Sequence, residues 1–191
     1  MKTITAATVG LLALVGSAGA ARADVAALFA DGHGGIESGG TSEATGATGA
    51  NGTSPSAGLG YQLGARLLIF EGYYDHTGFG GGAGISRGIL GFRGGFGTND
   101  LRLVLRAGAG ILDEQGGALS GRPPGMPDRR GEVGRVGAAL EGRVARLLLV
   151  GFGVDGEAFA LPAATGPYGS MPSTVGTDVF ANLHLLFELG V

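Results

Sequence analysis

The C-terminal segment, residues 175–191, alternates between apolar and polar or small side chains, and this pattern sharply limits the possible folds. A period of two is typical of a β-strand that has different environments on its two faces. One face would carry the apolar set: Val175, Thr177, Val179, Ala181, Leu183, Leu185, Phe187, Leu189 and Val191. The other face would carry Gly176, Asp178, Phe180, Asn182, His184, Leu186, Glu188 and Gly190.

The same alternation recurs upstream and predicts eight strands in all. Helices are disfavoured, because 42 of the 191 residues are glycine and glycine weakens a helix interior. In residues 67–77 we expect Leu67, Glu71, Tyr73 and Asp75 to point inward and Leu68, Phe70 and Tyr74 outward. The seven upstream strands are expected at 25–37, 57–65, 67–77, 85–97, 101–112, 133–143 and 146–158.

The connections between these strands alternate in length. Short turns are expected near 64–66, 97–100 and 143–146. Long connections, rich in Gly, Ser, Thr and Pro, are expected at 38–56, 77–84, 114–131 and 161–174. An even strand number with short turns at one end and long loops at the other is typical of bacterial membrane barrels.

The N-terminus is typical of an export signal. Lys2 precedes an apolar run at residues 6–15, and Ala21-Arg22-Ala23 has the form of a cleavage site. We expect a Sec signal peptide at 1–23 and a mature domain at 24–191, with an uncleaved membrane anchor as the alternative. Lys2 and Arg22 lie in the signal, so 11 of the 13 basic residues remain against 16 acidic ones. That balance gives no basis for nucleic-acid binding.

A sheet with one continuous apolar face must cover that face. A second sheet or a soluble core does so in water, whereas lipid does so in a membrane, where open edges are too costly and the sheet must close. The strand lengths suit a membrane. We therefore expect an all-β fold: an eight-stranded antiparallel up-and-down transmembrane β-barrel after the signal peptide. A soluble, secreted Gly-rich β-protein is the alternative.

Residues 25–191 resemble the small outer-membrane β-barrel proteins of the OmpA-like membrane-domain type. The local motif is the last strand, which in that family is read by the assembly machinery and usually ends in Phe. Here Leu185, Phe187, Leu189 and Val191 keep the phase, but the final residue is Val. The resemblance implies the bacterial outer membrane as location. It also implies outer-membrane lipid, lipopolysaccharide and the barrel-assembly machinery as partners, and a monomer.

The inward face of such a barrel would hold a cluster of charges. An eight-stranded barrel is barely wide enough for its own side chains, so these groups either form a salt-bridged plug or line a narrow path for ions or small solutes. The candidate lumen residues are Glu71, Arg93, Arg102, Arg106, Arg135, Glu141, Asp155, Asp178 and His184.

Catalytic and metal sites have little support in the sequence. There is no cysteine, and the three histidines, His33, His76 and His184, are scattered. Asp75 and His76 with Ser86 have the residue types of a triad but no triad spacing. We expect no catalytic residue, no cofactor and no metal, and a structural or surface-interaction role. Three loop arginines are expected to be solvated or to touch lipopolysaccharide phosphates: Arg122, Arg129 and Arg130.

Overall fold

The computed structural model describes residues 26–43, 51–52, 56–80, 82–98, 100–115, 128–166 and 169–190. The predicted signal peptide at 1–23, Arg122 and Val191 lie outside these residues. None of the described residues belongs to a helix that is long and apolar enough to cross a membrane.

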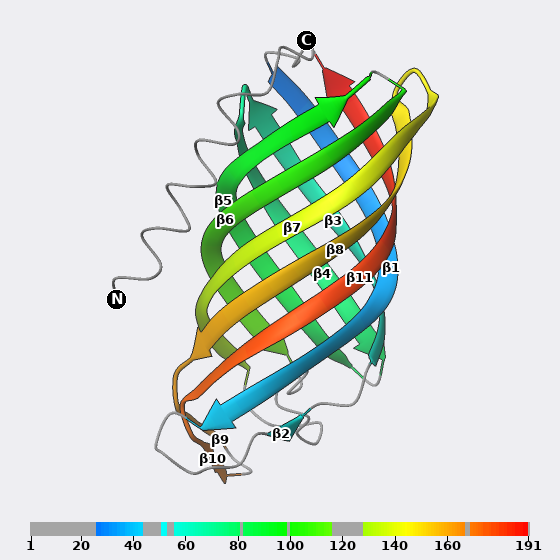
Figure 1. The fold of residues 1–191 in the computed structure, drawn as a ribbon. Coiled ribbons are helices and arrows are strands. Elements are labelled where there is room, and N and C mark those ends of the chain that lie inside the picture. Colours follow the sequence, from blue (N-terminus) through cyan, green and yellow to red (C-terminus); the bar gives the residue numbers. More distant parts are fainter. Residues whose placement is uncertain are drawn as a thin grey trace.

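Eight long strands make up the body of the protein (Figure 1). They are β1 (Ala26–Glu43), β3 (Ser56–Leu67), β4 (Phe70–Gly80), β5 (Ala83–Gly97), β6 (Leu101–Gln115), β7 (Arg129–Ala145), β8 (Leu148–Leu161) and β11 (Thr174–Gly190). Three short strands lie at the loop end: β2 (Asn51–Gly52), β9 (Ala164–Gly166) and β10 (Gly169–Met171).

The long strands form a closed antiparallel barrel. Each strand pairs with the next long strand along the chain, and β11 pairs with β1 from Ala27↔Gly190 to Glu43↔Thr174. The predicted up-and-down topology and strand number are therefore confirmed. Because the sheet closes on itself, both edges of every long strand have a partner.

The strands are strongly staggered. A path across paired residues once round the barrel runs from Ala30 through Leu63, Tyr74, Gly88, Ile111, Glu132, Ala160 and Val175 to Ser42. The path returns to β1 12 residues further along. With a rise of about 3.3 Å per residue and a strand spacing of about 4.8 Å, this shear corresponds to a tilt of about 45° and a backbone diameter of about 18 Å.

Side chains alternate between the lumen and the outer wall. On β11, Asp178, Asn182 and His184 are buried, whereas Leu183 is 66% exposed. The outer wall is apolar on every long strand, with Leu59 77% exposed and Leu90 76% exposed. Exposed apolar surface on this scale is characteristic of a protein that contacts another apolar phase.

One turn lies elsewhere than the sequence predicts, and the strands are longer than predicted. The turn predicted at 64–66 lies at Leu68 and Ile69, where Leu68 has a φ of 56°, and Leu67 is on the outer wall instead of in the lumen. The connection predicted at 77–84 is short, because β4 and β5 continue to Gly80 and Ala83. Pairing with the neighbouring strand extends these segments beyond the residues that alternate clearly.

Inward-facing glycines allow the curved strands to approach closely. A Cβ at Gly35, on the seam that closes the barrel, would collide with the backbone carbonyl of Ala181 on β11. A Cβ at Gly32, on the same strand, meets no described atom within 4 Å.

We expect Gly35→Ala to destabilise the closed barrel by about 1–3 kcal/mol, because the seam has no room for a methyl group. Gly32→Ala is the matched control and should leave stability unchanged. The temperature at which the detergent-folded chain loses its SDS-resistant, fast-migrating form measures the effect. Equal transition temperatures for the two variants would contradict this account of the seam.

Candidate functional site: the charged lumen

The lumen near the strand turns holds a network of alternating charges, which we call the turn-side network: Arg66, Arg93, Arg102, Glu141, Glu188 and His184. Arg102 bridges two carboxylates, with its Nη2 2.8 Å from Glu141 and 3.1 Å from Glu188. Arg66 also pairs with Glu188, at 3.0 Å. Arg93 pairs with Glu141, which lies 3.6 Å from the ring of His184. Every arginine in this network therefore has an acidic partner.

A second group, the central network, occupies the middle of the lumen: Asp75, Arg87, Arg106, Arg135, Asp155 and Glu157. Arg135 contacts three carboxylates, Asp75 at 3.2 Å, Asp155 at 3.0 Å and Glu157 at 3.4 Å. Arg87 pairs with two of the same carboxylates, Asp75 at 3.1 Å and Glu157 at 2.8 Å. Arg106 donates two hydrogen bonds to Asp155, a bidentate arrangement with high geometric specificity.

The loop end of the lumen is closed by apolar side chains and one further ion pair. The buried apolar residues there include Ile85, Leu112, Val133, Phe159 and Leu161. Beyond them, fully buried Arg129 pairs with Glu114 at 2.7 Å and donates to Thr174 at 3.0 Å. The lumen thus contains charged layers and an apolar layer, and its described part holds no group of His, Asp and Glu residues arranged for a metal ion.

Asp178 lies in the lumen outside both networks. It is 3% exposed, and neither of its oxygens has a side-chain partner among the described residues. Its neighbour across the β8–β11 pairing is Glu157, which carries the same charge. Asp178 is therefore a buried carboxylate without a described cationic partner.

Comparisons with known proteins bear on the fold. No protein-family model matches the sequence, and a search of curated proteins finds no match either. Neisserial surface protein A aligns by structure with a TM-score of 0.56 at 8% identity, covering 83% of this chain and 96% of that one. The fold is that of the small outer-membrane β-barrels. Outer membrane protein AlkL (TM-score 0.44, 10% identity, 92% and 95% coverage) and OprG from Pseudomonas aeruginosa (0.40, 12%, 88% and 97%) also align.

The outer-membrane-type barrel places all nine candidate lumen residues on its inner face. Glu71, Arg93, Arg135, Glu141, Asp155, Asp178 and His184 are buried, and Arg102 and Arg106 are nearly so. The turn-side and central networks collect seven of them, and Glu71 and Asp178 belong to neither network. Their role as a plug or as a pore lining stays a prediction.

Several lumen residues were missed by the sequence analysis. Arg129 was expected in a loop, yet it is 2% exposed and paired inside the barrel, whereas Arg130 is exposed and pairs with Asp113. Arg66 was assigned to a turn, and the shift of that turn to Leu68 and Ile69 puts it in the lumen. The inward phase of β6 and β7, continued toward the loops, would have identified Glu114 and Arg129.

The three residues weighed as a triad do not assemble into one. His76 Nδ1 lies 3.0 Å from Ser86 Oγ on the outer wall of the barrel. Asp75 faces the lumen, where it pairs with Arg87 and Arg135. Neighbouring residues on a strand face opposite sides, so Asp75 cannot orient His76.

The predicted assembly signal lies on the outer wall of β11. Leu185, Phe187 and Leu189 are 50%, 47% and 49% exposed and share one face. Their apolar side chains are therefore available to a partner or to lipid. Val191, the last member, is outside the described residues, and recognition of this strand by assembly machinery stays a prediction.

Removing Arg135 should destabilise the barrel by about 3–5 kcal/mol, because Arg135→Met leaves three buried carboxylates, Asp75, Asp155 and Glu157, with only Arg87 and Arg106 to balance their charge. Arg130→Met, at the exposed pair with Asp113, should leave the stability nearly unchanged, because water and salt screen an exposed ion pair. Urea unfolding of both variants in lipid vesicles measures the difference. Similar losses for the two variants would show that the central network contributes nothing specific.

Asp178→Asn should have the opposite sign and stabilise the barrel by about 1–2 kcal/mol, because it removes a buried charge while keeping the side-chain shape. The same unfolding measurement applies. Asp155→Asn is the control and should destabilise, since Asp155 has two arginine partners. A loss of stability in Asp178→Asn would mean that this carboxylate has a stabilising cationic partner in the membrane.

Proposed function

We propose that this chain is a bacterial outer-membrane protein with a structural or surface-interaction role, exported through the Sec pathway and held in the membrane by its barrel. The apolar outer wall and the similarity of fold support the location. Outer-membrane lipid and lipopolysaccharide are its expected surroundings, and the barrel-assembly machinery its expected partner during insertion.

The filled lumen is the observation that carries this proposal. Two charge networks cross the interior, and the buried apolar residues around Leu112 and Phe159 occupy its loop end. Moving an ion through this interior would require breaking several buried ion pairs and hydrating an apolar layer. A barrel of this kind is suited to present its loop end to the surroundings and poorly suited to transport.

A narrow channel is the second candidate, and one observation favours it. A cavity of about 10 Å³ lies inside the central network, lined by Asp31, His33, Asn182 and neighbouring charged groups. That volume is about enough for one water molecule, and polar groups line it. A chain of such waters is the minimum that a conducting path would need.

We expect the mature chain to give no stepwise currents in planar lipid bilayers. The insertion control is the heat-dependent shift in gel mobility of the same sample, which reports a closed barrel. The double variant Arg106→Ala/Arg135→Ala removes two large cationic side chains from the centre of the lumen. If any variant gives stepwise currents, we expect it to be this one. Steps in the unmodified chain that disappear in Arg102→Ala or Arg106→Ala would overturn the proposal in favour of the channel.

A further inference from the structure

The outer wall of β3, β4 and β5 carries a cluster of polar and aromatic side chains, which we call the wall cluster: Tyr61, Tyr74, His76 and Ser86. Their neighbours on the strands, Asp75, Thr77 and Arg87, are buried in the lumen, so the cluster faces outward. Tyr61 and Tyr74 are 45% and 44% exposed. Polar groups on a wall that faces hydrocarbon are costly unless they have partners.

Hydrogen bonds inside the wall cluster satisfy only part of its capacity. The Tyr74 hydroxyl donates to Ser86 Oγ at 3.0 Å, and His76 Nδ1 contacts the same oxygen at 3.0 Å. The Tyr61 ring packs against both Tyr74 and His76, at centroid distances of 6.1 and 5.7 Å. The Nε2 atom of His76 has no hydrogen-bond partner among the described residues. The cluster can therefore offer a hydrogen bond to a molecule beside the barrel.

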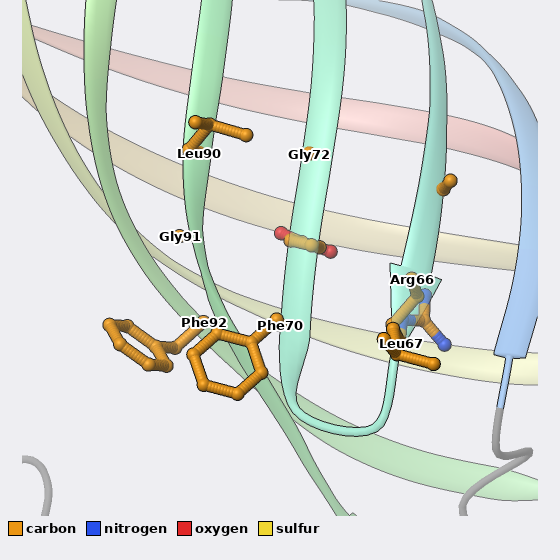
Figure 2. A pocket seen from close by; sticks show the side chains of 9 residues that line it. Arg66, Leu67, Phe70, Gly72, Leu90, Gly91 and Phe92 are labelled. Carbon is orange, nitrogen blue, oxygen red and sulfur yellow. The ribbon is translucent and has the colours of Figure 1, made fainter.

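An apolar groove lies on the same three strands, nearer the turns (Figure 2). Its volume is about 450 Å³. Leu90 and Phe92 of β5 flank it on one side and Leu67 of β3 on the other, and Phe70 lies beside Phe92 with ring centroids 5.1 Å apart. Gly72 keeps the floor open, because a Cβ there would press against the Leu90 side chain at 2.8 Å.

The wall cluster and the groove are separated by the depth of one membrane leaflet. On β4, Gly72 and Tyr74 lie between Phe70 and His76, so both sites belong to one continuous track. Six residues of strand span about 20 Å, or about 14 Å of depth at a 45° tilt, which is close to half of a hydrocarbon core of about 30 Å. A lipid with its polar end at His76 would therefore place a chain over Gly72 and against Leu90.

We propose that this track binds one ester-linked diacyl lipid of the loop-side leaflet, an inference that rests on the proposed membrane location. His76 donates from Nε2 to one of its ester carbonyl oxygens, Ser86 and Tyr74 orient the imidazole through the hydrogen bonds at Nδ1 and at Ser86 Oγ, and one acyl chain occupies the groove. The wall cluster contains no Lys or Arg, and Arg87 points into the lumen. Arg130 on the neighbouring wall is paired with Asp113, the cross-strand neighbour of Ser86, so the chemistry fits a neutral acceptor better than a phosphate.

The test uses the folded chain in detergent with an equimolar mixture of two phosphatidylcholines, one ester-linked and one ether-linked, of different mass. Native mass spectrometry counts the lipids retained. We expect one retained lipid, with the ester form preferred about tenfold, which corresponds to one hydrogen bond in an apolar setting. The double variant His76→Ala/Ser86→Ala should lose the preference.

The groove is tested separately with a matched pair of variants. Gly72→Val fills the groove and should reduce retention of both lipids about tenfold, through lost apolar contact. Gly134→Val adds the same side chain at an exposed position on β7 where a Cβ meets no described atom within 4 Å, and it should retain lipid as the unmodified chain does.

Equal retention of ester and ether lipids by the unmodified chain, or equal effects of Gly72→Val and Gly134→Val, would overturn the inference. Its failure is distinguishable from failure of the proposed function. If the chain is not a membrane protein, the mature form will be soluble without detergent and show no heat-dependent shift in gel mobility. If only the lipid site is wrong, both membrane properties will remain.

Discussion

Closure of the backbone hydrogen-bond ladder is the constraint on which the rest of the structure depends. A strand that faces hydrocarbon must pair along both edges, because unpaired backbone groups have no water to replace their partners. The pairing of β1 with β11 over most of their length meets this requirement. Closure with a stagger of 12 residues then sets the tilt and the diameter, and with them the space that side chains must fill.

The lumen follows from that space. Charged residues point inward from all eight long strands and together include both signs, and the low-dielectric interior favours pairing between them. Arg102 and Arg135 each join carboxylates from different strands, so the ion pairs connect strands that are far apart in sequence. Buried ion pairs are weak evidence for net stability, but these pairs can form only when the strands have the observed register.

The outer wall is largely apolar, and its polar groups include the ion pair of Asp113 with Arg130 and the wall cluster. Asp113 and Arg130 lie near the loop ends of β6 and β7 and pair with one another in an exposed setting. The wall cluster around His76 and Ser86 adjoins this pair, since Ser86 is the cross-strand neighbour of Asp113, and an apolar groove lies on the turn side of the cluster along the same strands. The polar and the apolar parts of the outer wall therefore meet at the wall cluster.

The sequence by itself determined the strand number, the up-and-down order and the face of most side chains, because alternation is local and each strand carries it independently. It identified Glu141 and Asp155 as inward but not their partners, since pairing depends on the stagger between strands. The turn at Leu68 and Ile69, the inward place of Arg66 and the ion pair of Arg129 were decided by tertiary structure. So was the meeting of His76 with Ser86. Each of these features depends on which residue of the neighbouring strand lies opposite. That register is a property of the closed sheet and not of any single strand.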